Sequence, residues 1–374
     1  MKEGWEYRRF ESCLIKVSKQ VQVKSKDYKK EGKFPIVSQE AELISGYWDD
    51  EAIVYKHKEP VVIFGDHTKN IKYVDFDFVV GADGTHILRT KNDIEPKFFY
   101  YVLKSIKLRE LGYARHYKLL KEEYIPVPPL SEQQTIVDYL DSAFAKIDVM
   151  KANAEKALNE AKALFQASLK EMLEPKEGWE EKKVGEVAEI KGGKRIPKGE
   201  KLLSEPTTHK YIRVADFNEY GTVDLGDIRY ISDNVYEQIK RYIINKEDIY
   251  ISIAGTIGKS GIIPEELDGA NLTENACRLI LSKEIYQRFM YYTTISPEFI
   301  RQEIESTKIS AQPKLALTRL ADIIIAYPSI VEQQNIAATL DSLKSKVDRL
   351  QANYEKISQE CNALKQAILR QVFE

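Results

Sequence analysis

Apolar residues recur in steps of four and three along two stretches of the chain, which is the spacing of a coiled-coil helix. After Pro328 they run for about five heptads, from Ile336 to Ile368. After Pro129 the same spacing runs from Ile136 to Ser168, with smaller residues at its centre. Because proline stops a helix from extending upstream, each helix is expected to start just after these prolines. The pattern predicts two long helices, over 131–174 and 329–374.

The two predicted helices share one register, which favours packing against each other over packing of each helix on its own domain. We expect an antiparallel pair, since a parallel one would require the second globular part to span the whole coiled coil. The residues expected to pair the helices or bind partners are Ile136, Leu140, Ile147 and Leu164 in the first helix and Ile336, Leu340, Leu343, Val347, Leu350, Leu364 and Ile368 in the second.

An internal repeat relates the two halves of the chain. Lys2-Glu3-Gly4-Trp5-Glu6 recurs as Lys176-Glu177-Gly178-Trp179-Glu180, and Glu132-Gln133-Gln134 recurs as Glu332-Gln333-Gln334. The offset grows from 174 to 200, so the second copy carries about 26 additional residues. Identity is strong at the ends of the copies and nearly absent between them. The simplest interpretation is that the two halves share one architecture and perform two versions of the same task.

Short apolar runs such as Val61–Phe64 and Ile249–Ile253 predict strands in both globular parts, with a helix over 95–110 in the first and another near 284–305 in the second. The predicted fold class is therefore α+β. Two mixed α/β domains, at 1–130 and 175–328, are expected to be related by pseudo-twofold symmetry and separated by the antiparallel coiled coil.

Composition narrows the class of protein. A hydrophobic fraction of 43% over 374 residues excludes wholesale disorder. A net charge of −2, from 56 basic and 58 acidic residues, excludes a polycation, so any nucleic-acid contact needs local basic patches. The start of the sequence does not resemble a signal peptide, and no membrane span is predicted. Three scattered cysteines favour a reducing cytoplasm over a disulfide framework or zinc ribbon.

Catalytic and metal-binding motifs fail when tested against their spacing. The run Gly255–Ser260 resembles the end of a phosphate loop, but Ile253 occupies the position where that loop needs glycine. The hydrolase motif GxSxG and the zinc motif HExxH do not occur, and the histidines show no metal-ligand spacing. The Asn-Pro-Pro-Tyr motif of DNA amino-methyltransferases and a GxGxxG cofactor loop are also absent. We therefore expect no catalytic residues, no metal site and no cofactor in this chain, and favour a binding protein.

The organisation resembles the specificity subunit of type I restriction–modification systems. The resemblance rests on Pro-Leu-Ser-Glu-Gln-Gln-Thr-Ile at 129–136 and Pro-Ser-Ile-Val-Glu-Gln-Gln-Asn-Ile at 328–336, each leading into a long helix, and on Gly4-Trp5 and Gly178-Trp179 at the starts of the halves. The run Ile251–Lys259 and the segment Val61–Thr68 are similar to recurrent parts of its recognition domains. The resemblance covers the whole chain.

The resemblance implies a division of labour. Target-recognition domains at 1–130 and 175–328 would each read one half of a bipartite double-stranded DNA site. The helices would set the spacer and dock methyltransferase subunits, and through them a restriction or translocase subunit. The chain itself would be non-catalytic and cytoplasmic, with S-adenosylmethionine expected on the methyltransferase. The alternatives are a coiled-coil adaptor that joins proteins without touching DNA, and an enzyme.

Basic residues concentrate in three stretches, 16–33, 104–121 and 191–213, as expected of a surface that contacts phosphates, although a solvated lysine-rich loop gives the same pattern. We expect Arg195 and Arg213 to read guanine, because a guanidinium can bind O6 and N7 together. The full set of predicted DNA contacts is Lys24, Lys26, Lys29, Lys30, Arg115 and Lys118 in the first domain, and Lys194, Arg195, Lys198, Arg213 and Lys259 in the second.

Overall fold

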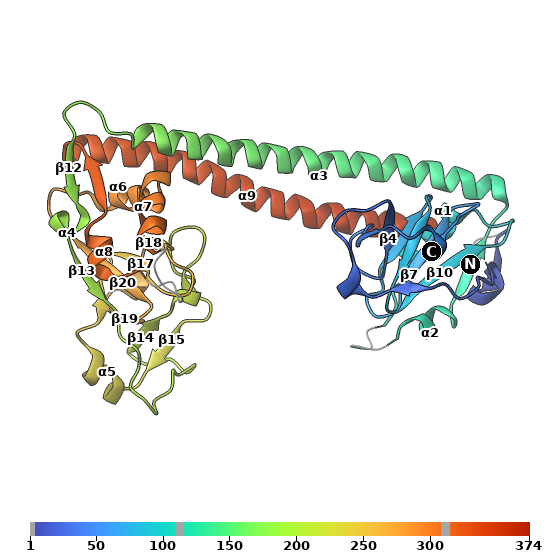
Figure 1. Ribbon diagram of the computed structural model, residues 1–374, viewed down its shortest axis with the longest axis horizontal. Coiled ribbons are helices and arrows are strands. Elements are labelled where there is room, and N and C mark those ends of the chain that lie inside the picture. The colour runs from blue at the N-terminus through green and yellow to red at the C-terminus, as the bar shows by residue number, and fades with distance from the viewer. Residues whose placement is uncertain (1–3, 110–111, 113–114, 308–314) are drawn as a thin grey trace. The chain divides into compact units, whose positions relative to one another are not determined.

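The chain divides into two compact units (Figure 1). A computed structural model describes residues 4–109, 112, 115–307 and 315–374. The first unit comprises Met1–Ala154 with Glu355–Glu374, and the second comprises Glu155–Tyr354. Each unit therefore contains one globular part together with a portion of both long helices.

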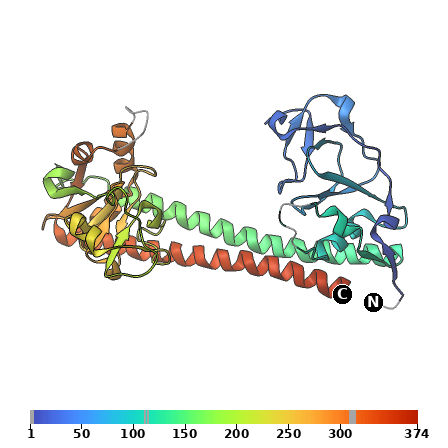
Figure 2. The same ribbon diagram turned by 90° about the horizontal axis from the view of Figure 1, so that it is seen from below.

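The first unit is built from antiparallel and mixed sheets whose strands stand to one side of the long helix α3 in Figure 2. β1 (Glu6–Arg9) pairs with β11 (Tyr124–Val127). A four-stranded sheet has the order β2 (Leu14–Ile15), β10 (Thr85–Thr90), β7 (Val61–Gly65), β8 (Ile71–Val74). A five-stranded sheet contains β3 (Gln22–Val23), β9 (Phe78–Gly81), β4 (Phe34–Val37), β5 (Gly46–Trp48) and β6 (Val54–Tyr55).

Helix α1 (Pro96–Ser105) forms the core of the first unit with β7 and β10. Its start is fixed by the Glu95 side chain, which accepts a hydrogen bond from the backbone of Phe98, and by proline at the first helical position. Phe98 and Phe99 are fully buried and belong to the same core as Phe64 of β7. The other helical segments of the unit are α2 (Tyr117–Leu120), η1 (Phe10–Cys13), η2 (Ser25–Asp27) and η3 (Glu51–Ile53).

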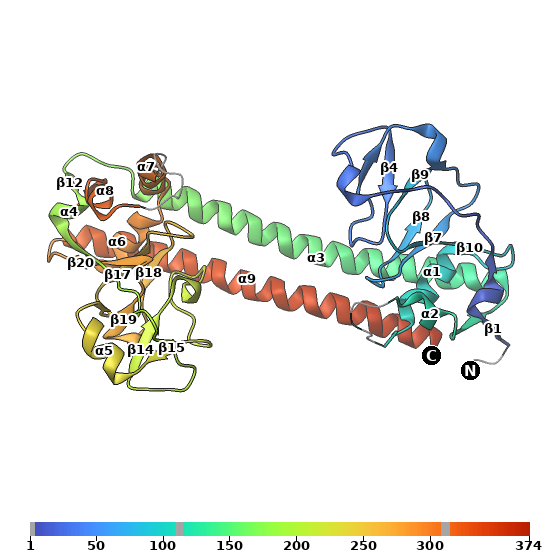
Figure 3. The same cartoon turned by 60° about the horizontal axis from the view of Figure 1, so that its bottom comes forward.

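The second unit repeats the strand pair and the four-stranded sheet of the first (Figure 3). β12 (Glu180–Lys183) pairs with β21 (Ile324–Tyr327). One sheet has the order β13 (Ala188–Gly192), β20 (Ala276–Leu281), β17 (Ile249–Ser252), β18 (Ser260–Ile262). The other has the order β15 (Arg229–Ile231), β14 (His209–Ile212), β19 (Ala270–Leu272), β16 (Ile243–Ile244), and α5 (Asp233–Ile239) packs against it.

The helix predicted near 284–305 is two helices, α6 (Gln287–Thr294) and α7 (Pro297–Thr307). Pro297 explains the break, because proline has no amide hydrogen to continue α6 but suits the first position of α7. Similarly, the helix expected over 95–110 ends at Ser105. The remaining helical segments of this unit are α4 (Val184–Val187), α8 (Leu317–Ala321), η4 (Val214–Asp216) and η5 (Glu265–Leu267).

The two long helices are α3 (Leu130–Met172) and α9 (Ile330–Phe373), and they pair antiparallel within each unit. In the first unit Leu140 shares a core with Leu369, whereas Ile147, further along α3, meets the earlier Cys361. In the second unit Lys162 donates a hydrogen bond to Gln351 at 2.7 Å. The predicted antiparallel pairing is thus present in both units. The exact domain bounds and the pseudo-twofold relation between the domains stay predictions.

Most residues predicted to pair the helices are turned inward. Leu140, Ile147, Ile336 and Leu340 are buried. The others that are at least half-buried are Ile136, Leu343, Val347, Leu350 and Ile368.

Two residues of this set do not pair the helices, so for them only the partner-binding part of the expectation is left. Leu164 is 60% exposed and Leu364 is 47% exposed. On α3 the contact uses Phe165, which packs edge-on against Tyr292, and adjacent residues of a helix point about 100° apart, so Leu164 faces outward. On α9 Lys365 takes the inward direction, with its Nζ 2.6 Å from Asp148, which leaves Leu364 outside.

Candidate nucleic-acid interface

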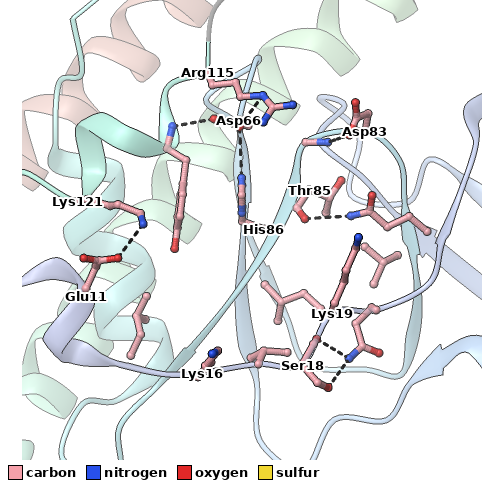
Figure 4. Close-up of a pocket in the computed structure, with 18 of the residues that line it drawn as sticks. Glu11, Lys16, Ser18, Lys19, Asp66, Asp83, Thr85, His86, Arg115 and Lys121 are labelled. Atoms are coloured by element: carbon pink, nitrogen blue, oxygen red, sulfur yellow. Dashed lines mark hydrogen bonds and ion pairs between the residues drawn. The ribbon is translucent and has the colours of Figure 1, made fainter.

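A groove of about 640 Å³, named the basic groove, opens on the first unit (Figure 4), and four basic side chains line it together with the acidic Glu11, Asp66 and Asp83. Its walls come from the segment after β2, from β10 and from the residues around the start of α2. The side chains of Lys16, Lys19 and Arg115 line it, together with Lys121, whose Nζ lies 2.8 Å from Glu11. Such a groove can hold an anion such as a phosphate.

Asp66 lies beside the groove directly after β7, and three backbone hydrogen bonds fix its position. Its own amide donates to Gly84 at 2.8 Å. Its carbonyl oxygen accepts from the amide of His116 at 2.8 Å, and its carboxylate Oδ1 accepts from the amide of Tyr117 at 2.8 Å. Strand β7 and the residues that follow Arg115 are therefore tied together at one nearly buried carboxylate.

The other carboxylate oxygen of Asp66, Oδ2, faces two nitrogen-bearing side chains of the groove, as Figure 4 shows. His86 Nε2 lies 3.4 Å away and Arg115 Nε lies 3.9 Å away. The His86 ring stacks on Tyr117 with centroids 4.0 Å apart. Burial raises the pKa of the Tyr117 hydroxyl, so this ring remains neutral beside the lysines. Arg115 is thus exposed to solvent beside Asp66, which the backbone amides of His116 and Tyr117 hold in place.

The second unit presents another exposed arginine, Arg195. Its Nε donates a hydrogen bond to Glu274 Oε1 at 2.5 Å, and this bond raises the pKa of the guanidinium. Burial acts to raise the pKa of Glu274, but hydrogen bonds from Arg195 and Thr273 outweigh it and the pKa is lowered. The pair is therefore fully ionised at neutral pH.

The backbone before Arg195 is held against β19. Lys194 donates its amide hydrogen to the carbonyl of Leu272 at 2.8 Å. A side chain on Gly193 would approach the carbonyl oxygens of Leu272 and Thr273 to 2.4 Å and 2.0 Å, so only glycine fits there. The role of Gly193 is therefore to let the chain after β13 pass close to the end of β19, which fixes the position of the backbone at Arg195.

The structure distributes the other predicted DNA contacts over several surfaces. Lys29 is ion-paired with Asp49 at 2.7 Å, and Lys259 donates to the carbonyl of Phe217 at 3.2 Å. Of the first-domain candidates, Arg115 lies among the described residues that line the groove. The remaining candidates are exposed and lie outside it: Lys24, Lys26, Lys30 and Lys118 in the first unit, and Lys194 and Lys198 in the second.

Arg213 does not suit the guanine-reading role expected of it. Its Nε donates to Asp216 at 3.1 Å, and its Nη2 donates to the carbonyl of Asp227 at 2.8 Å. Both carboxylates also pair with the guanidinium, and the Asp216 carboxylate accepts the backbone amide of Arg213 at 2.7 Å at the start of the 3-10 turn Val214–Asp216. A base edge would have to displace these partners, so the physical role of Arg213 is to join two loops of its own domain.

Sequence reasoning missed Asp66 and His86, and it counted Lys16 and Lys19 as basic residues without naming them as contacts. The two lysines fall in the basic stretch 16–33, so the signal was present. Asp66 meets its partners about 50 residues away at Arg115–Tyr117, a distance in sequence that local patterns do not bridge.

Across residues 4–109, 112, 115–307 and 315–374, no group of three or more histidine, cysteine, aspartate or glutamate side chains is arranged to hold a metal ion. Within the same described residues, helices are either too short or too polar to cross a membrane.

Comparison with known proteins assigns the class. The family model for the type I restriction modification DNA specificity domain matches residues 2–160 and again residues 176–359. The chain belongs to this family, and each half of the repeat carries one match. The doubled match also agrees with the antiparallel helices and the paired strand modules described above.

The chain is similar to named specificity subunits. It is 27% identical over 321 residues to the type I restriction enzyme EcoBI specificity subunit of Escherichia coli, an alignment that covers 74% of this chain and 65% of that protein. With the EcoR124I/EcoR124II specificity subunit, also of Escherichia coli, it shares 25% identity, covering 85% of this chain and 81% of the relative. The chain thus spans just under two thirds of the first relative.

Two solved structures share the fold. A chain from a structure on complex assembly and conformational transition of the type I R-M system superposes with a TM-score of 0.74 at 19% identity, covering 100% of this chain and 98% of that one. The HsdS subunit from Thermoanaerobacter tengcongensis gives a TM-score of 0.51 at 18% identity, with coverage of 100% and 97%.

Proposed function

We propose that this protein is the DNA sequence-specificity subunit of a type I restriction–modification complex, and that each globular part reads one half of a bipartite site. The observation that carries this proposal is the doubled specificity-domain match, one in each half of the chain. The basic groove of the first unit and the exposed Arg195 of the second supply surfaces suited to DNA. In this role the chain binds and positions DNA, and it contributes no catalytic group.

The partners we propose are methyltransferase subunits, which would carry S-adenosylmethionine, and through them a restriction or translocase subunit. Exposed apolar side chains on the long helices support docking of a protein on them. In the first unit these are Val149, Met150 and Leu364, and in the second unit Leu164. Apolar side chains that gather on the outside of a helix pair, as the neighbours Val149 and Met150 do, are one mark of a protein-interaction surface.

A domain exchange tests the proposed division of labour. Residues 181–323 would be replaced by the corresponding part of another specificity subunit, and the recognition sequence of the assembled complex determined before and after. The expected result is a change in one half-site and in no other part of the motif. A change in both half-sites, or in neither, would contradict the proposal.

A salt titration separates this function from that of a protein adaptor. Phosphate contacts release counterions, so the logarithm of the DNA association constant should fall linearly with the logarithm of salt concentration, by about 0.9 per phosphate contacted. An adaptor with solvated basic loops would show no specific complex with any duplex.

A further inference from the structure

The same side-chain device occurs in both units: an exposed arginine whose Nε faces a more buried carboxylate. The Arg115 side chain is 75% exposed and that of Asp66 is 6% exposed, with Nε and Oδ2 3.9 Å apart. The Arg195 side chain is 76% exposed and that of Glu274 is 24% exposed, with Nε and Oε1 2.5 Å apart. The two pairs come from different elements, so the internal repeat alone does not explain them.

A carboxylate at Nε, hydrogen-bonded in the Arg195 pair and at ion-pair distance in the Arg115 pair, orients a guanidinium without using its far edge. The two terminal nitrogens remain available to donate two parallel hydrogen bonds, and O6 and N7 of guanine accept such a pair in the major groove. Arg213 is the contrast, because carboxylate and carbonyl oxygens already occupy its Nη2 as well as its Nε. Lysines such as Lys16 and Lys19 offer only a point charge, which suits phosphate.

Each carboxylate also accepts a hydrogen bond from a second residue, Tyr117 for Asp66 and Thr273 for Glu274. Asp66 is tied to the amides of His116 and Tyr117, which directly follow Arg115. Glu274 accepts a hydrogen bond at 3.0 Å from the hydroxyl of Thr273, whose amide donates to Ile212 of β14. Arginines held in this way lose less conformational freedom when they bind, which favours discrimination between bases.

We propose that Arg115 and Arg195 each read a guanine in the half-site of their own domain, and that Asp66 and Glu274 are positioning residues for them. This rests on the proposed function, and it names the chemistry by which that function selects a sequence. Because different elements supply the two arginines, the half-sites are expected to place their guanines differently relative to the spacer.

The test uses the full chain assembled with its methyltransferase subunits and selects bound duplexes from a randomised library. Arg115→Ala should relax one base pair of the first half-site, reducing discrimination there by roughly 5- to 150-fold and leaving the second half-site intact. Arg195→Ala should do the same in the second half-site. Arg301→Ala is the matched control, since Arg301 is also exposed but its Nη nitrogens are held by Glu298 and Glu305.

The positioning role has its own readout. Asp66→Asn keeps an acceptor for the Tyr117 amide, and it should relax the same base pair as Arg115→Ala, while the double variant should be no worse than Arg115→Ala alone. Glu274→Gln should be coupled to Arg195→Ala in the same way, and Glu274→Asp should restore part of the discrimination. A purely structural role would give losses that add and that spread over the whole half-site.

The outcomes distinguish two failures. If the unmodified complex selects no motif, the proposed function is wrong. If it selects a bipartite motif and Arg115→Ala and Arg195→Ala leave every position of it unchanged, the function stands and the assignment of these arginines is overturned. Thermal unfolding of each variant identifies any that fail to fold, and in that case Glu274→Gln, at a more exposed site, replaces Asp66→Asn as the deciding variant.

Discussion

The side-chain amide of Gln133 donates a hydrogen bond to the carbonyl oxygen of Pro128 at 2.8 Å, across the start of helix α3. Its Nε2 also donates to the carbonyl of Asp93, and its Oε1 accepts from the amide of Glu95. Gln333 makes the same contacts with Pro328, Glu284 and Tyr286. The repeated Glu-Gln-Gln sequence is therefore explained by its first glutamine, a fully buried clamp between each long helix and its globular part.

Replacing either clamp should destabilise its unit. Gln133→Ala and Gln333→Ala leave the carbonyl of Pro128 or Pro328 without its buried partner, at a cost of about 1–3 kcal/mol in the free energy of unfolding. Gln134→Ala and Gln334→Ala are the matched controls, because these neighbours are exposed. Urea unfolding measures both. Equal, small effects at all four positions would show that the clamp contributes nothing.

Burial raises the pKa of Glu303, in helix α7, to about 7. A carboxyl with a raised pKa in the folded state favours folding while it is protonated. That contribution is complete below the ordinary value of 4.5 and is lost as pH rises towards 7. Glu303→Gln should therefore stabilise the protein above about pH 7, on the order of 3 kcal/mol, with little effect near pH 4.

Urea unfolding of the wild type and Glu303→Gln at several pH values measures this difference. Glu305→Gln, two residues further along α7 and exposed, provides the control. A stability difference between the wild type and Glu303→Gln that does not change with pH would contradict the raised pKa.

Substitution of two adjacent residues tests which face of α3 packs inward. Phe165 packs in the core of the second unit, so Phe165→Ala should cost about 3–5 kcal/mol of stability. Leu164→Ala should change stability by about 0.5 kcal/mol or less, because its side chain is exposed. Thermal or chemical unfolding of the two variants measures these losses of stability. A larger loss for Leu164→Ala than for Phe165→Ala would instead support the register predicted from the heptads.

The groove lysines should contribute to affinity and leave specificity unchanged. Lys16→Ala and Lys19→Ala are each expected to weaken binding to all duplexes alike and to reduce the slope of log association constant against log salt by about 0.9 if each contacts one phosphate. Fluorescence anisotropy with the assembled complex measures both effects, with the exposed Lys58→Ala as control. A loss confined to one DNA sequence would instead indicate base contacts.

Sequence patterns predicted the elements that depend on local periodicity. The heptads located both long helices, and the repeat located the paired modules. The same heptads could not choose between Leu164 and Phe165, because both neighbours are apolar and the partner surface at Tyr292 decides which one turns inward. Pro297 itself signals a helix break in the sequence, but the prediction placed a single helix near 284–305.

The candidate site was predicted in part. Basic stretches and guanidinium chemistry pointed to Arg115 and Arg195, but they also selected Arg213, whose carboxylate partners at Asp216 and Asp227 are visible only in the fold. The Asp66 anchor could not be inferred, since it meets Arg115 across about 50 residues of chain.

Mapping the bases methylated by the complete complex in cells that carry it tests whether this chain specifies a two-part sequence. We expect one motif made of two defined half-sites separated by a fixed number of unspecified bases. A continuous motif, or methylation without any sequence preference, would contradict the assignment of one reading domain to each half of the chain.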